Sequence, residues 1–213
     1  MLLSIIILIF SSILHEVAHG YIAYRLGDPT AKILGRLTLN PKPHIDLFMT
    51  ILVPIMTFIG SGGRLIFGGA KPVPVDPFNL RDGMKDLALV SLAGPGTNII
   101  LAVVGAIVAH VVFPNATFFE IESSGILGFI IKTIIEWNIL LAILNLLPIP
   151  PLDGSKIFAL LLPERTAASY LAIGNNGLGI IILLFLFYFP IGGFSLSGIL
   201  GALIGYAIQL LGF

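Results

Sequence analysis

The sequence contains no cysteine among its 213 residues, and only 10% of its residues are charged. The absence of cysteine excludes disulfide bonds and thiolate ligands, so any metal ion must be held by histidine and carboxylate side chains. Soluble domains have about 25% charged and about 45–50% apolar residues. Here 57% are hydrophobic and the mean hydropathy is +1.06. The formal net charge is zero, which gives no reason to expect a nucleic-acid partner. The expected surroundings are a lipid bilayer.

Long hydrophobic runs predict where the chain crosses the bilayer, since about 20 apolar residues are needed to span its core. A further run, residues 47–59, has about 13 residues and suits a re-entrant segment better than a span, with a sixth full span as the alternative. We therefore predict an all-α polytopic membrane protein with five to six transmembrane helices and a short re-entrant or β segment between the first and second full spans. The five full spans are expected at residues 2–26, 87–113, 126–147, 170–189 and 194–213.

The stretch between the first two full spans is rich in polar residues, glycine and proline. Alternation of apolar and polar residues over 33–39 predicts a short extended piece, and the composition of 60–85 predicts a loop with a β-hairpin. No separate soluble domain is expected. Residues 1–162 are predicted to form a core of three spans that carries the chemistry, and residues 163–213 to add two C-terminal spans.

The basic residues predict the orientation, because cytoplasmic loops of membrane proteins carry an excess of lysine and arginine. Eight of the 11 basic residues lie between Arg25 and Lys85. If 47–59 is re-entrant, all eight lie together on the cytosolic side, with the N-terminus outside and the C-terminus inside. If 47–59 spans the membrane, four of these basic residues lie on each side, and the excess of positive charge predicts no orientation. We prefer the re-entrant alternative.

The first hydrophobic run contains His15-Glu16-Val17-Ala18-His19, an HExxH motif. On a helix, His15 and His19 lie one turn apart on the same face, as two ligands of one metal ion must. Glu16 lies beside them, within reach of a water molecule at the metal. Ionisable groups within a span are costly and usually functional. The pattern predicts a zinc site, although a pair of core histidines bonded to the backbone or to Glu16 is the alternative.

A third ligand must come from elsewhere in the chain, and three ionisable residues in or near spans are candidates. His110 is expected near the outer end of its span, as an interfacial or backbone-bonded histidine. Glu136 is expected to pair with Lys132 at i, i+4. Asp153 follows a proline-rich break at 148–151, and irregular backbone at membrane depth is tolerated only where it lines a cavity. We therefore predict Asp153 as the third ligand, with a helix N-cap or turn as the alternative.

Three motifs together resemble the site-2 protease family of intramembrane zinc metalloproteases, in its compact branch without a PDZ domain. They are His15–His19, Ala93-Gly94-Pro95-Gly96-Thr97-Asn98, and the stretch from Asn145 to Gly154 that contains Leu152-Asp153-Gly154. The resemblance implies one zinc ion held by His15, His19 and Asp153, with Glu16 as the base. It also implies that Asn145 lines the substrate or stabilises the oxyanion, and that Asn98 makes a polar contact in the same cavity.

The function implied by this resemblance is hydrolysis of a peptide bond in or near a transmembrane segment of a substrate protein. The protein is then expected in the cell membrane of a bacterium or archaeon, with its active site toward the cytosol. Two other classes are open: a transporter or channel with a polar site at the membrane centre, and a catalytically inactive homologue that binds its partner. The glutamate next to the histidine pair argues against a transporter, and the complete set of catalytic side chains argues against an inactive homologue.

Overall fold

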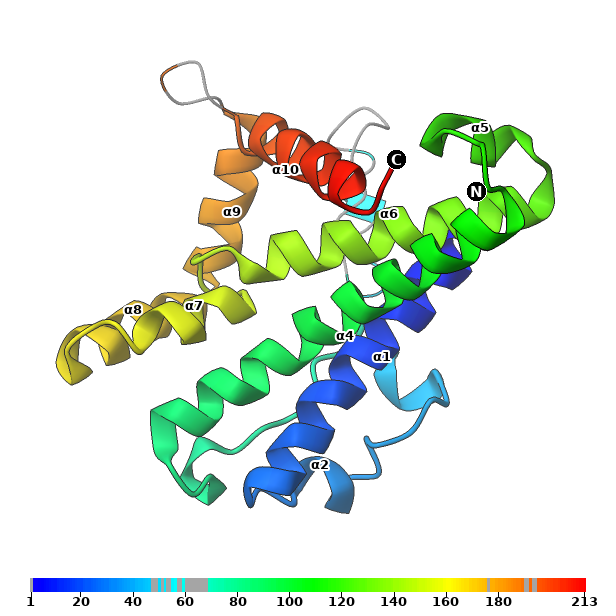
Figure 1. Cartoon of the computed structure of the whole chain (residues 1–213). Helices are drawn as coiled ribbons and strands as arrows, with labels where there is room; N and C mark the ends of the chain where they lie inside the picture. Colours follow the sequence, from blue (N-terminus) through cyan, green and yellow to red (C-terminus); the bar gives the residue numbers. More distant parts are fainter. Residues whose placement is uncertain are drawn as a thin grey trace.

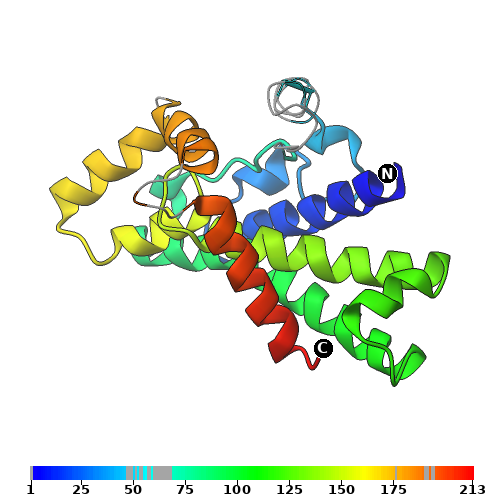
Figure 2. The same ribbon diagram turned by 90° about the horizontal axis from the view of Figure 1, so that it is seen from above.

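The computed structural model describes residues 2–46, 50, 52, 55–56, 59, 69–175, 177–189, 192 and 195–213. Three long helices form its centre: α1 (Leu2–Leu26), α4 (Gly83–Val112) and α6 (Ile126–Leu146). They lie side by side and alternate in direction, as Figures 1 and 2 both show. Each is long and apolar enough to cross a membrane, with a mean hydropathy of 1.9. These helices correspond to the first three predicted spans, and the helical membrane-protein class is confirmed.

The core between α4 and α6 is built from small residues facing branched ones. Ala102, Ala106 and Ala109 of α4 are buried against Ile131 and Ile135 of α6. Small residues let two helix backbones approach closely, which is how helices associate where lipid is as apolar as the protein. The opposite face of α4 exposes large apolar side chains, as expected of a surface that faces lipid: Ile99, Ile100, Val103, Val104, Ile107, Val108 and Val111.

The C-terminal part of the chain differs from two simple spans. After α7 (Asp153–Ala159), helix α8 (Glu164–Asn175) leads into α9 (Leu178–Tyr188), and the pair is bent by 73°. The last helix, α10 (Leu196–Leu210), has 15 residues. Among the described residues, three helices could cross a membrane, or four if the bent pair counts as one span. The predicted number of five to six spans stays a prediction.

The C-terminus lies at the end of the bundle opposite to the one predicted. Phe213 stacks on His110, with ring centroids 4.3 Å apart, and His110 belongs to the last turn of α4. The Leu211 carbonyl bonds the same histidine at 2.8 Å. The C-terminal residues therefore sit beside the loop that follows α4, whereas the sequence placed them on the side of the basic loops. The bend of 73° between α8 and α9 redirects the chain before α10, which the sequence alone did not indicate.

The connection between α1 and α4 holds short helices and irregular backbone, and none of its described residues forms a strand. Helix α2 (Thr30–Ile33) occupies the start of the predicted extended piece at 33–39, which turns at Gly35 (φ 65°) instead of extending. Two 3-10 turns, η1 (Lys42–His44) and η3 (Pro77–Asn79), follow. The β-hairpin predicted within 60–85 is wrong for residues 69–85. Its remaining residues, and most of the predicted re-entrant segment 47–59, lie outside the described residues.

Candidate metal centre

Three ligand-type atoms from two distant parts of the chain meet at the centre of the bundle. His15 and His19, both on α1, place their Nε2 atoms 3.0 Å apart. The Oδ2 atom of Asp153 lies 3.2 Å from the first and 3.0 Å from the second. All three side chains are buried. The structure thus brings Asp153 to the histidine pair, and among the described residues these are the three groups that could share one metal ion.

The hydrogen bonds of both histidines place the single hydrogen of each neutral imidazole on Nδ1. His19 Nδ1 lies 2.7 Å from the carbonyl oxygen of Val90, which can only accept, so Nδ1 carries the hydrogen. His15 Nδ1 lies 2.6 Å from Oδ1 of Asn98 and donates to it in the same way. A histidine that ligates zinc through one nitrogen typically donates its other N–H to a carbonyl or carboxylate oxygen. Both imidazoles therefore present a lone pair to the space in front of Asp153.

A break after α6 brings Asp153 into this space. Helix α6 ends at Leu146, and the chain turns before α7 begins at Asp153 itself. Gly154 makes the close approach possible, because a Cβ there would lie 2.5 Å from the carbonyl oxygen of Leu147 and closer still to that of Leu146. Lys156, one turn further along α7, donates to Asp153 Oδ1 at 3.0 Å. The carboxylate is thus held through one oxygen while the other faces the histidines.

The space between the three donor atoms is kept open by a glycine. Gly94 of α4 faces the two imidazoles, and a Cβ added there would lie 2.5 Å from His15 Nε2 and closer still to His19 Nε2. Donor atoms at the corners of a tetrahedron around zinc, with bonds of 2.0–2.1 Å, lie about 3.3 Å apart. The observed separations of 3.0–3.2 Å are close to that value. Two imidazoles, a carboxylate and an open side therefore fit a zinc ion.

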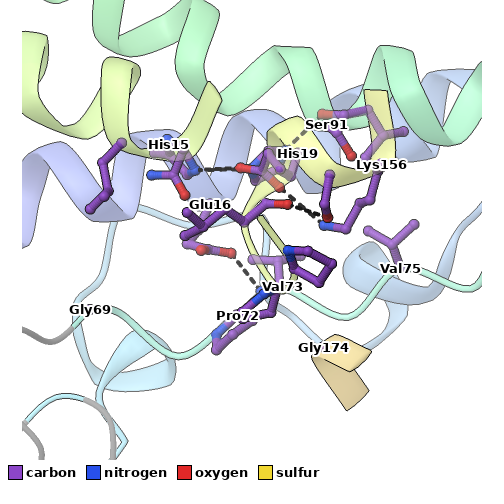
Figure 3. Close-up of a pocket in the computed structure, with 18 of the residues that line it drawn as sticks. His15, Glu16, His19, Gly69, Pro72, Val73, Val75, Ser91, Lys156 and Gly174 are labelled. Atoms are coloured by element: carbon purple, nitrogen blue, oxygen red, sulfur yellow. Dashed lines mark hydrogen bonds and ion pairs between the residues drawn. The ribbon is translucent and has the colours of Figure 1, made fainter. Parts of the chain in front are cut away.

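The carboxylate of Glu16 lies beside this centre, at its open side. Figure 3 shows it next to His15 and pointing toward Val73, whose backbone N–H donates to Glu16 Oε2 at 2.7 Å. Val73 belongs to an irregular segment, residues 70–76, that crosses in front of the site. Arg36, itself buried, fixes this segment by donating to the carbonyl oxygens of Lys71 and Pro72 at 2.7 and 3.3 Å. The glutamate is thus oriented by backbone that the first connection supplies.

A cavity of about 550 Å³ opens onto this centre. His15, Glu16, His19 and Asp153 line it together with residues from α4, α6, α8 and α9 and from the irregular segment. Its wall is mostly apolar, with a few converging polar groups, which is typical of a substrate site. Asn145 is part of the wall and donates to the carbonyl oxygen of Leu141 in its own helix at 3.0 Å. The structure thus places Asn145 where a substrate contact is expected.

Asn98 occupies a different place from the one expected. Its side chain is fully buried, on the far side of the His15 ring from Asp153, where it bonds His15 and the amide of Asn138. The expected cavity contact is therefore replaced by a contact with a histidine. Sequence reasoning missed Asn138 and Lys156 altogether. A lone amide within an apolar helix was the available signal for Asn138, because buried polar groups in spans need partners.

The two rejected third-ligand candidates lie away from the site. His110 is bonded to the backbone of Leu211, as predicted. Glu136 pairs with Lys132 at 2.9 Å, also as predicted, and the same lysine pairs with Glu122 at 2.8 Å. Neither carboxylate nor the His110 ring takes part in the cluster of ligand atoms around His15.

An HExxH helix completed by a distant aspartate, inside a bundle of membrane-spanning helices, defines an integral membrane protein with a metallopeptidase-type centre. Comparison with known proteins narrows this class. The chain belongs to peptidase family M50, whose model matches residues 3–134 and 116–188.

Curated relatives support the same assignment. The chain is 38% identical over 200 residues to "Putative zinc metalloprotease YwhC" of Bacillus subtilis, covering 93% of this chain and 85% of the relative. A protein of Mycobacterium tuberculosis strain H37Rv with the same description and the name Rip2 is 32% identical over 178 residues, which are 83% of this chain and 63% of that protein. The relative MJ0611 of Methanocaldococcus jannaschii is 35% identical over 96 residues, 44% of this chain and 46% of its own. No solved structure was found to match the chain significantly.

Proposed function

We propose that this protein is an intramembrane zinc endopeptidase that hydrolyses a peptide bond in or near a transmembrane segment of a substrate protein. The observation that carries the proposal is the meeting of His15, His19 and Asp153, with Glu16 beside them, at the wall of a cavity inside a bundle of apolar helices. Membership of a peptidase family gives this arrangement its reaction class. We assign one zinc ion to the three donor atoms.

Zinc, when bound, polarises the substrate carbonyl and lowers the pKa of water to about 7. The protein's own groups do the rest. Glu16 takes a proton from the attacking water and delivers it to the leaving amine, as a general base and then a general acid. Its Oε2 accepts the N–H of Val73 at 2.7 Å, which orients the carboxylate and leaves Oε1 to receive the proton. Lys156 holds Asp153 in place throughout.

The substrate must reach the site as extended backbone, because a helix hides each scissile carbonyl in an internal hydrogen bond. The segment Lys71–Val75 crosses the site, and Pro72, Val73 and Val75 line the cavity. Its Lys71 and Pro72 carbonyls already bond Arg36, and its Val73 N–H bonds Glu16. We therefore expect the unwound part of a transmembrane substrate to lie along the side chains of this segment, with Asn145 facing it from α6.

Replacing one carboxylate tests the proposal. Glu16→Gln keeps the shape of the side chain and removes its ability to take a proton, so the purified variant should retain zinc and lose cleavage of a transmembrane substrate. Glu136→Gln is the matched control, because Glu136 is 44% exposed and pairs with Lys132 away from the site. That variant should cleave normally. Wild type that binds no zinc, or a Glu16→Gln variant that cleaves like wild type, would contradict the proposal. Transport activity without bound zinc would favour a transporter or channel. Wild type that binds zinc but does not cleave would favour an inactive binding homologue.

We further propose that the protein lies in the cell membrane of a bacterium or archaeon with the site toward the cytosol. The end of α1 and the start of α4 lie together at one end of the bundle (Figure 1), and Arg25, Lys32, Lys71 and Lys85 lie in or next to the connection between these two helices. The His44 carbonyl accepts the Lys71 N–H at 2.7 Å, which supports placing both flanks of segment 47–59 on one side. Single cysteines at Thr38 and Pro74 should then react with the same membrane-impermeant reagent from the cytosolic side. Labelling from opposite sides would refute this topology.

A further inference from the structure

Two buried amide side chains, Asn98 and Asn138, link the metal centre to α6. Asn138, on α6, has no exposed surface and contacts Asn98 of α4 and Ser11 of α1. Asn98, equally buried, contacts His15. The three long helices therefore meet through polar side chains at one level of an otherwise apolar bundle. Burying polar groups costs free energy unless every one of them is hydrogen-bonded. A fully bonded series of polar side chains inside this apolar bundle therefore indicates a specific role.

The donor and acceptor of each hydrogen bond in this series are set by its end farthest from the metal centre, at Ile134. The carbonyl oxygen of Ile134 can only accept, and Asn138 Nδ2 lies 2.8 Å from it, so the amide nitrogen faces this way. Asn138 Oδ1 then faces Asn98 and accepts from its Nδ2 at 2.8 Å. Asn98 is thereby turned so that its Oδ1 faces His15 Nδ1 at 2.6 Å. His15 must donate from Nδ1, and in the neutral imidazole its Nε2 then carries the lone pair.

We propose that Asn138 is a positioning residue, which fixes the tautomer of His15 through Asn98 and so keeps Nε2 available for the metal ion. The inference rests on the proposed zinc site. If Asn98 turned its amide around, its NH2 would face Nδ1, and the proton would move to Nε2, which could then not bind a metal. His19 needs no such relay, because a backbone carbonyl of α4 receives its Nδ1 proton directly. His15 is the one histidine of the pair whose tautomer depends on side chains.

The test compares two buried polar residues of the same helix. Asn138→Leu removes the anchor of the relay. Thr133→Val is the control, because Thr133 is buried and, among the described residues, its hydroxyl bonds the carbonyl oxygen of Phe129 in its own helix and no other helix. We expect Asn138→Leu to weaken zinc binding, measured by competition with a chelator at fixed pH, by about 10- to 100-fold, as is common for partners of metal ligands. Nitrogen NMR of the zinc-free protein should show mixed tautomers for one histidine. Thr133→Val should change neither.

A second pair of variants separates positioning from packing. A carboxylate at position 98 accepts in either orientation, so in an Asn98→Asp background the loss caused by Asn138→Leu should disappear. An equal loss in both backgrounds would reduce Asn138 to a packing residue and overturn the proposal. If Asn138→Leu does not fold, Asn98→Leu removes the relay one step nearer to His15 and should weaken zinc binding over the same range; unchanged binding overturns the proposal.

The outcomes also distinguish this inference from the proposed function. Wild type without zinc affinity or cleavage refutes the proposed function itself. Wild type that binds zinc and cleaves, together with an Asn138→Leu variant of unchanged affinity and tautomer, refutes only the positioning role.

Discussion

Gly94→Ala adds a single methyl group to the metal centre, and its effect follows directly from the packing of α4 against α1. The new Cβ would lie 2.5 Å from His15 Nε2, 2.6 Å from His15 Cε1, and closer still to His19 Nε2. Cβ atoms in real structures essentially never come within 3.0 Å of such neighbours, so α4 or the imidazoles must move by about 0.5 Å or more. Both histidines are held by bonds to α4 on their other nitrogen, which leaves little room for that movement.

The size of the effect can be worked from the cost of overpacking, which is about 1–3 kcal/mol for an extra methyl group in a well-packed interior. The methyl group would press on the Nε2 atoms of both histidines, so we expect a cost of this size when these atoms are needed as ligands. Each 1.4 kcal/mol is a factor of ten in affinity. We therefore expect zinc affinity to fall by at least about 5- to 150-fold, and proteolysis to fall with it.

The assay measures zinc bound by the purified variant and its dissociation constant by chelator competition, alongside cleavage of a transmembrane substrate. Gly96→Ala is the matched control on the same helix, because a Cβ at Gly96 meets nothing within 4 Å. That variant should bind zinc like wild type. A Gly94→Ala variant with wild-type zinc affinity would refute the assignment of the space beside Gly94 to the metal ion.

Three further predictions follow from single contacts. Lys156→Met should lower zinc affinity by about tenfold, and Lys156→Arg should restore part of it, because the lysine holds Asp153 at 3.0 Å. Gly154→Ala should lower the free energy of unfolding by about 1–3 kcal/mol, seen as a lower Tm. The reason is that its Cβ would lie 2.5 Å from the Leu147 carbonyl oxygen. Gly201→Ala is the control and should leave the Tm unchanged, because a Cβ at Gly201 meets nothing within 4 Å. Burial raises the pKa of Asp28, but hydrogen bonds from Thr30, Asp76 and Asn79 outweigh it and hold that pKa below its usual range. The resulting stability is present above the unfolded pKa of about 3.9 and is lost as pH falls through the folded pKa, so the Tm difference between wild type and Asp28→Asn should shrink below pH 4 and stay constant above it.

Much of the site could be predicted because the spacing of its residues along the sequence indicates which of them share a helix face. The four-residue interval between His15 and His19 fixes a shared helix face, and Asp153 follows a break that no uninterrupted span would contain. The predicted pair of Lys132 and Glu136 is of the same kind, since both lie one turn apart on one helix. Local periodicity therefore gave the three long helices and the chemistry that lies on them.

Features that depend on which helices face each other could not be predicted in this way. The role of Asn98 changed from a cavity contact to a partner of His15 because α4 presents this residue to the buried side of α1. The link between Asn138 and His15 depends on Asn98 of a neighbouring helix, which the sequence does not place next to Asn138. The bend between α8 and α9 and the docking of Phe213 on His110 likewise arise from tertiary packing. An apolar run in the sequence indicates neither the bend nor the docking contact.

The long interval between the proposed ligands has a consequence for biosynthesis. His19 leaves the ribosome 134 residues ahead of Asp153 (153 − 19). At about 5–20 residues per second, this takes roughly 7–27 seconds. During that time the nascent chain holds two imidazoles and no third ligand, so any zinc captured early is weakly held. Tight loading of the proposed zinc site is therefore delayed until α6 has been made and α7 has turned back against it.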